Sequence, residues 1–257
     1  MSASQRQLFN QLIAEADAAH LEGWDFGFLN GRAVSTPLPW DYLGAASALV
    51  AASYRALDVD TGGGEIFAAL KPPRGSVAVE PYPPNLTISA QRLQPLGVKV
   101  RERITDRLPV SDESFDLVLN RHGYMNLNEF SRALRPGGTL LTQQVGAKND
   151  IEFNKALGIP ESNTPGAPLS THDLRNNVRA AGFENCHVSE ATVSTRFLDI
   201  GAVVFQLRAV PWQAPGFRSD THRDQLWRIH NHIVQTGSFQ VCSQRFLIKA
   251  DKPDKPR

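Results

Sequence analysis

The sequence predicts an α/β fold in which a mostly parallel sheet is covered by helices on both faces. Short apolar runs alternate with amphipathic segments between residues 56 and 145, the order that parallel strands and their crossover helices require. A glycine-rich turn, TGGG at 61–64, directly follows the first of these runs. The length of 257 residues allows one large domain with a well-buried core.

The spacing of apolar residues and the positions of Gly and Pro predict where helices and strands begin and end. Apolar residues at helical spacing predict helices, and short apolar runs bounded by turn residues predict strands. Pro-Pro-Asn suits the first turn of a helix, whereas Arg-Pro-Gly-Gly and Gly182 end helices. The expected helices cover 5–19, 42–52, 84–93, 127–134, 170–182, 199–209 and 221–235. The expected strands cover 56–59, 76–80, 98–103, 115–120, 139–145, 183–190 and 239–249.

Composition argues against several classes of partner. The 27 basic and 26 acidic side chains leave a net charge of +1, whereas nucleic acids and membrane surfaces attract clustered positive charge. The chain has no secretory signal pattern and no apolar run of the ~20 residues that span a bilayer. Cys186 and Cys242 lack the spacing of zinc ligands, and HExxH is absent, so we expect no metal site. We therefore expect a cytoplasmic protein with two reduced thiols.

The stretch LDVDTGGGE carries the main functional signal. A strand holding Asp58 ends here, and Gly62, Gly63 and Gly64 let the backbone turn sharply and approach a ligand. Glu80 ends the next strand, where a carboxylate is well placed to accept hydrogen bonds from ribose hydroxyls. The pair predicts a site for a nucleoside-containing cofactor.

Two other interpretations of this loop remain open. The NAD fingerprint is G-x-G-x-x-G, but Phe67 stands where its third glycine would allow close helix packing, which disfavours NAD. The glycines also suit a tight turn that binds no ligand. The acid at Glu80 favours the cofactor site over such a turn.

The ordered motifs resemble class I SAM-dependent methyltransferases of the small-molecule branch called type 11. LDVDTGGGE is similar to their D-x-G-x-G-x-G motif, and LPVSDESFDLVLNRH and EFSRALRPGGTLLTQQVG resemble the following regions, in the same order. The flanking segments WDFGFLNGR and FLDIGAVVFQLRAVPW resemble an uncharacterised subgroup of these enzymes. The resemblance implies a Rossmann-like, mostly parallel seven-stranded sheet whose last strand is antiparallel.

The resemblance also implies a domain plan. Residues 1–250 form a single methyltransferase domain in this interpretation. Its parts are a helical cap over 1–53, a cofactor-binding core over 54–146 and a C-terminal half with a helical insert over 147–250. The polar tail 251–257 is expected to be disordered.

S-adenosyl-L-methionine (SAM) is the cofactor that the resemblance implies. Asp60 stands where the family has its first glycine, and its carboxylate either bonds the cofactor's ammonium group or obstructs the cofactor. Asp106 is a candidate acceptor for the adenine amino group, or else a solvated turn residue. The implied cofactor-binding residues are Asp58, Asp60, Thr61, Gly62, Gly63, Gly64, Glu80, Asp106, Asn120 and Arg121.

Residues at the ends of later strands are candidates for substrate binding. His122 follows the fourth strand and is the candidate catalytic base, or else a group that positions the cofactor. Gln143 and Gln144 end the fifth strand and suit substrate positioning. Trp24 and Phe26 lie in an upstream loop that either lines the substrate cavity or packs the N-terminal helix.

These features predict an enzyme that moves a methyl group from SAM to an O, N or C atom of a small molecule by in-line displacement. The alternative is a SAM-binding or regulatory protein of the same fold that has lost transfer. An RNA methyltransferase is disfavoured by the near-neutral charge. We expect a monomer or a homodimer.

Overall fold

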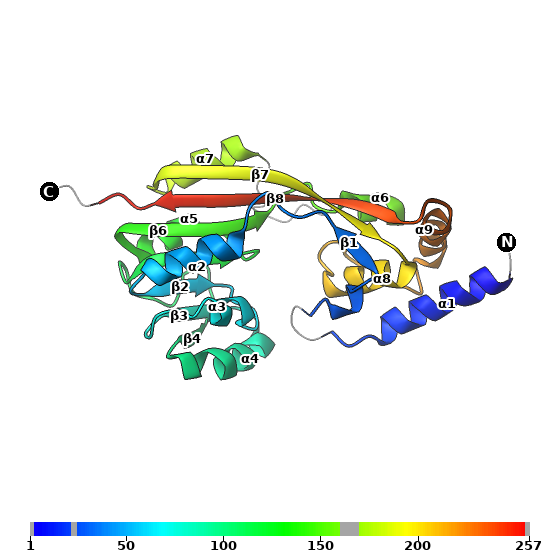
Figure 1. Ribbon diagram of the computed structural model, residues 1–257, viewed down its shortest axis with the longest axis horizontal. Coiled ribbons are helices and arrows are strands. Elements are labelled where there is room, and N and C mark those ends of the chain that lie inside the picture. Colours follow the sequence, from blue (N-terminus) through cyan, green and yellow to red (C-terminus); the bar gives the residue numbers. More distant parts are fainter. Residues whose placement is uncertain (1–2, 22–24, 160–169, 255–257) are drawn as a thin grey trace. The chain divides into compact units, whose positions relative to one another are not determined.

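The computed structural model describes residues 3–21, 25–159 and 170–254. Among these residues, eight strands form one sheet in the order β1-β7-β8-β6-β5-β2-β3-β4 (Figure 1). No described helix combines the length and apolar character needed to cross a membrane. The strands are β1 (Ala33–Ser35), β2 (Ala56–Val59), β3 (Val77–Glu80), β4 (Lys99–Glu102), β5 (Phe115–Arg121), β6 (Leu134–Val145), β7 (Glu184–Phe197) and β8 (Phe239–Asp251). The helices are α1 (Ala3–Ala18), α2 (Tyr42–Ala52), α3 (Glu65–Ala69), α4 (Pro83–Leu93), α5 (Leu127–Ala133), α6 (Ile151–Leu157), α7 (Thr171–Ala180), α8 (Ile200–Ala209) and α9 (Arg223–Thr236), with short 3₁₀ turns at Gly27–Leu29 and Gln94–Leu96.

Four helices begin at side-chain caps that the sequence supplies. Asp41, Asn126, Ser170 and Asp199 each accept a hydrogen bond from the backbone N–H three residues further on. Such a cap satisfies one of the N–H groups that the first helical turn leaves unpaired. The capped start predicted at Ser170 is confirmed, and α2 spans its predicted residues.

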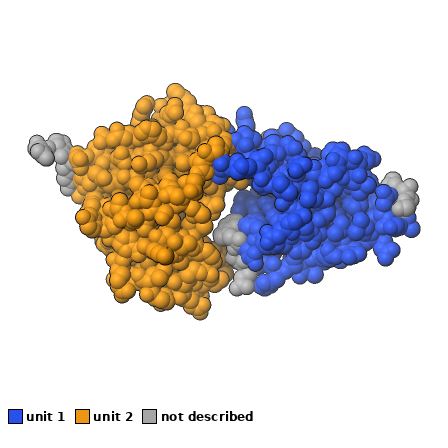
Figure 2. Space-filling view, in the orientation of Figure 1, with its two compact units in different colours: residues 1–38, 147–165, 192–244 blue, residues 39–146, 166–191, 245–257 orange. Residues whose placement is uncertain are grey.

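The chain divides into two compact units. The first unit holds residues 1–38, 147–165 and 192–244, and the second holds 39–146, 166–191 and 245–257 (Figure 2). The residues expected to form the 1–53 cap are shared between them, because α2 belongs to the second unit.

The second unit contains the parallel part of the sheet. β5, β2, β3 and β4 pair in parallel, as do β5 and β6. Alternate residues of β2 point to opposite faces, so Leu57 and Val59 pack beneath α5 and α7, whereas Ala56 packs with α2, α3 and α4. Helices therefore cover both faces, and the predicted Rossmann-like α/β class is confirmed.

The prediction of seven strands is wrong by one. β1 pairs antiparallel with β7, with Ala33 opposite Phe197 and Ser35 opposite Thr195. Its three residues are too short to show a periodicity, and pairing with a distant segment defines them. The same pairing explains why β7 continues to Phe197, seven residues beyond its expected end.

The last strand is antiparallel, as expected, but it extends further than expected. β8 pairs with β6 from Arg245 to Asp251, so Asp251 lies within the sheet. Lys252 continues the ordered chain, because its Nζ donates to the carbonyl oxygens of Ser131 and Leu134 at 2.9 and 2.7 Å. The prediction of a disordered tail is therefore wrong for 251–254, and 255–257 lie outside the described residues.

The first unit has a core of its own, built on aromatic side chains. Phe153, Phe197 and Phe205 are buried there with apolar residues of α1, α8 and α9. Phe28 stacks on Phe205 with ring centroids 4.7 Å apart. Arg32 pairs with Asp199, the cap of α8, at 2.7 Å. These contacts tie the N-terminal segment to α8.

His230 is a weak point in this core. It is 3% exposed and lies against the rings of Phe9 and Trp227, and neither of its ring nitrogens has a hydrogen-bond partner among the described residues. Burial lowers the pKa of His230, partly opposed by Asp199, so the folded protein holds the neutral ring. The unfolded chain takes up a proton as pH falls through ~6.5, so this residue costs stability in acid.

We expect His230→Phe to raise the free energy of unfolding by about 1 kcal/mol at neutral pH, because it removes an unsatisfied buried N–H. The gain should widen between pH 7 and 5. Urea unfolding followed by tryptophan fluorescence at several pH values measures it. His232→Phe, at an exposed position of the same helix, is the control. Equal pH dependence in wild type and His230→Phe would rule out this role.

Candidate functional site

The glycine loop follows β2, and three of its residues have a left-handed backbone conformation. Asp60, Gly62 and Gly64 have φ values of 57°, 62° and 77°. A Cβ on Gly64 would lie 2.9 Å from Leu93, so this glycine allows α4 to pack closely on the loop. α3 has five residues and is too short for its N-terminus to serve as a binding site. Ligand binding by this segment therefore depends on the amides of the loop and on neighbouring side chains.

Glu80 is held against this loop. Its Oε2 accepts the Gly62 N–H at 2.7 Å, and its Oε1 accepts the Tyr82 N–H at 2.9 Å. The side chain is buried, and burial raises its pKa while these two N–H groups oppose the rise. Each carboxylate oxygen has a second lone pair, so Glu80 can still accept hydroxyl hydrogens of a ligand. The structure thus brings together the two features that predicted a nucleoside site.

Asp58 lies beneath the same loop. Thr61 Oγ1 donates to its Oδ2 at 2.5 Å. Burial raises the pKa of Asp58 to about 7, opposed by the Thr61 hydrogen bond and reinforced by the charges of Asp60 and Glu80. The Arg121 guanidinium carbon lies 5.9 Å from the ring centre of Tyr42 and partly offsets this negative charge.

The carboxylate of Asp60 is bound by neighbouring groups. Arg103 forms an ion pair with it, with Nη2 3.1 and 3.2 Å from the two carboxylate oxygens. The Tyr124 N–H donates to Asp60 Oδ2 at 2.8 Å. A Cβ on Gly123 would lie 2.6 Å from Asp60 Cβ, so the side chain of Asp60 occupies space that Gly123 leaves open.

The ends of β5 and β6 are joined by buried amides. Asn120 Nδ2 donates to the Val59 carbonyl at 3.0 Å, which links β5 to β2. Its Oδ1 accepts hydrogen bonds from Thr142 Oγ1 and Gln144 Nε2 at 3.1 and 2.5 Å. Asn120 and Gln144 are both buried, so they hold the strand ends in place.

His122 and Gln143 lie together at this edge. Their ring and amide nitrogens are 3.0 Å apart, and Trp40 Nε1 donates to Gln143 Oε1 at 2.9 Å. His122 is an exposed residue, and partial desolvation, then the charges of Arg121 and Arg245, lower its pKa. A neutral ring can accept the Gln143 N–H through Nε2 and carry its own proton on Nδ1.

Asp106 is not part of this cluster. The Asp106 residue is exposed, and its main-chain oxygen accepts from Asn126 Nδ2. Phe26 belongs to the first unit, where it packs edge-on against Phe205. Trp24 lies outside the described residues. The other predicted residues all lie at the carboxyl ends of β2, β3, β5 and β6.

Sequence reasoning missed four residues at this edge, Tyr82, Arg103, Gly123 and Tyr124. Arg103 and Gly123 complete the surroundings of Asp60. Tyr82, Ile104 and Tyr124 follow β3, β4 and β5 with 59%, 84% and 49% of their surface exposed. Exposed rings and apolar side chains of this kind can offer a face to an aromatic ligand. Their position directly after a strand was the available signal.

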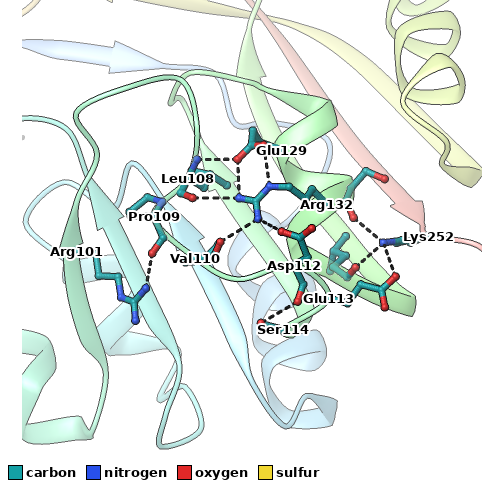
Figure 3. A network of polar contacts seen from close by, with 12 residues as sticks. Arg101, Leu108, Pro109, Val110, Asp112, Glu113, Ser114, Glu129, Arg132 and Lys252 are labelled. Carbon is teal, nitrogen blue, oxygen red and sulfur yellow. Dashed lines mark hydrogen bonds and ion pairs between the residues drawn. The ribbon is translucent and has the colours of Figure 1, made fainter.

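The segment between β4 and β5 is clamped to α5 (Figure 3). Arg132 donates to the carbonyl oxygens of Leu108 and Val110 and pairs with the carboxylates of Asp112 and Glu129. Glu129 in turn accepts the Leu108 N–H at 2.7 Å. These bonds hold the LPVSDESF motif against the EFSRALRPGG motif, which fixes the start of β5.

Comparison with known families and sequences gives one match. Residues 57–142 match the family of type 11 methyltransferases, described as a methyltransferase domain. This segment covers β2 to most of β6 and so includes the glycine loop, Glu80 and His122. No curated protein sequence matches the chain.

Solved structures share the fold. The YcgJ protein of Bacillus subtilis has a TM-score of 0.58 at 17% identity, covering 83% of this chain and 99% of its own. A putative methyltransferase of Bacillus halodurans has a TM-score of 0.57 at 20% identity, covering 82% and 98%. Phosphoethanolamine N-methyltransferase 2 of Haemonchus contortus, solved with S-adenosyl-L-methionine, has a TM-score of 0.50 at 16% identity, covering 82% and 53%.

Proposed function

From the methyltransferase domain that residues 57–142 form, we propose that this protein transfers a methyl group from SAM to a small molecule. The domain is of class I and of the type 11 branch. The observation that carries the proposal is Glu80, a buried carboxylate fixed against the glycine loop by the Gly62 N–H. This is the arrangement needed to hold ribose hydroxyls beside loop amides.

The residues at the carboxyl edge fit the cofactor. Glu80 keeps free lone pairs for hydroxyl groups, and Tyr82, Ile104 and Tyr124 offer exposed apolar surface for an adenine ring. Asp60 is paired with Arg103, so it does not present an uncompensated negative charge to the ligand. When bound, SAM supplies a methyl group already activated on a sulfonium.

The protein's own part is positioning and exclusion of water. In-line displacement requires the acceptor atom to lie opposite the departing sulfur, and such alignment can supply several kcal/mol, ~7–11 in the best intramolecular cases. Trp40 holds Gln143, and Gln143 holds the ring of neutral His122, whose Nδ1 proton can orient an acceptor. The low pKa of His122 favours this orienting role over that of a strong base. An acceptor that carries a proton must then lose it to water or to a weak base.

Binding and transfer should be tested separately on the full chain. Calorimetry is expected to show affinity for SAM and for its demethylated product SAH, and none for NAD. Labelled SAM with a library of O, N and C acceptors then reports transfer. Affinity without transfer to any acceptor would favour the regulatory alternative. Affinity for NAD alone would favour an oxidoreductase, and no affinity for SAM or SAH would reject the proposal.

A further inference from the structure

The ion pair of Asp60 and Arg103 is shielded from solvent. Both side chains are 12% exposed, and the guanidinium contacts both carboxylate oxygens. Charges in such surroundings act on each other more strongly than an exposed pair does. The Arg103 guanidinium carbon also lies 5.5 Å from the ring centre of Tyr124, whose N–H donates to Asp60.

The pair links loops that follow three different strands. Arg103 follows β4, and its own N–H donates to the carbonyl oxygen of Glu80 at the end of β3 at 3.0 Å. β3 lies between β4 and β2 in the sheet, and neighbouring strands are ~4.8 Å apart. The Arg103 side chain therefore crosses the end of β3 to reach Asp60 after β2. Tyr124 adds the loop after β5 to the same cluster.

Each consequence of an aspartate at this glycine position is compensated. The backbone keeps a left-handed φ of 57°, which aspartate tolerates better than most side chains. Gly123 leaves room for the added Cβ. Arg103 forms an ion pair with the added carboxylate.

We propose that Asp60 and Arg103 act together as a positioning pair that replaces the family's first glycine and holds the cofactor loop ready to bind. The pair does not react with the substrate. Asp60 lies two residues before Gly62, whose N–H is bonded to Glu80, so movement of Asp60 disturbs the cofactor contact. This inference rests on the proposed function, because SAM and SAH are the ligands concerned.

Calorimetry with SAH on full-length variants tests the pair. Arg103→Met leaves the Asp60 carboxylate uncompensated and should weaken SAH binding at least tenfold. Arg103→Lys keeps one ion pair and should lie between Arg103→Met and wild type. The double variant Asp60→Gly/Arg103→Met removes both charges and should bind within threefold of wild type. Arg101→Met, two residues earlier, in β4, and bonded to the Pro109 carbonyl, is the matched control and should bind like wild type.

Thermal melting of each variant separates this role from general instability. A merely structural pair would lower the melting temperature without restoring SAH affinity in the double variant. Unchanged or tighter SAH binding in Arg103→Met would overturn the proposal, and so would a double variant as weak as Arg103→Met. If Arg103→Met does not fold, Arg103→Lys takes its place in the comparison. Weaker SAH binding in Arg103→Lys than in the double variant would then support the proposal, and a double variant as weak as Arg103→Lys would overturn it. Failure of wild type to bind SAH would instead reject the proposed function itself.

Discussion

Glu80→Ala is expected to weaken SAH binding about 100-fold. The change removes the acceptor proposed for the ribose hydroxyls, so that the bound hydroxyl donors lose their partner. A buried donor without a partner costs about 1–3 kcal/mol, and about 2.7 kcal/mol corresponds to 100-fold in affinity. Calorimetry with SAH measures the loss. Glu102→Ala, an exposed glutamate at the end of the neighbouring strand, is the matched control.

The protonation of Glu80 gives this prediction a second readout. Burial raises the pKa of Glu80 above its usual value of ~4.3, and a protonated carboxyl loses acceptor capacity. SAH affinity should therefore fall as pH is lowered through that raised pKa. The fall should be absent in Glu80→Gln, which does not titrate there. Undiminished affinity in Glu80→Ala would show that the ligand does not contact this carboxylate.

Arg132→Met is expected to give the largest loss of stability, about 3 kcal/mol in the free energy of unfolding. Arg132 is 17% exposed and bonds two carbonyl groups and two carboxylates across the segment before β5 (Figure 3). Removing one partner of a shielded ion pair leaves the other charge uncompensated, which costs about 3–5 kcal/mol when burial is complete. Urea unfolding monitored by circular dichroism measures the change.

The control for Arg132 is a neighbouring arginine with fewer contacts. Arg135 is 48% exposed and pairs with Asp116 at 3.3 Å, so Arg135→Met should change stability by less than about 0.5 kcal/mol. Arg132 lowers the pKa of Glu129, so the carboxylate contributes stability above the unfolded value of ~4.3. That contribution is lost as pH falls through the lowered pKa. Similar losses in the Arg132 and Arg135 variants would show that the clamp is not a major source of stability.

Much of the second unit was predictable because its signals are local. Apolar runs and turn residues predicted β2 at its observed bounds and β3, β4 and β5 to within one residue at each end. The association of Glu80 with the glycine loop followed from chain order, since both follow adjacent parallel strands. β1 and the extension of β7 were missed because each is defined by pairing with a segment about 160 residues away.

The surroundings of Asp60 show why the rest of the site was not predictable. Arg103 lies 43 residues from Asp60, and Tyr124 lies 64 residues away. Nothing in the pattern around either residue marks it as a partner. From the sequence, the alternatives for Asp60 were a contact to the cofactor, which the resemblance favoured, and obstruction of the cofactor.

The amino-acid sequence alone determined the α/β class, the succession of strands and helices between residues 56 and 145, and the position of the glycine loop next to an acid. These features depend on periodicity and on residues close together in the chain. Only the tertiary structure decided which charged groups form ion pairs and which pKa values are shifted. Packing of the ends of β2, β4, β5 and β6 at one edge paired Asp60 with Arg103 and brought Gln143 to His122. The reason is physical: burial and the distances between charges set pKa values and ion pairs, and these distances exist only after folding.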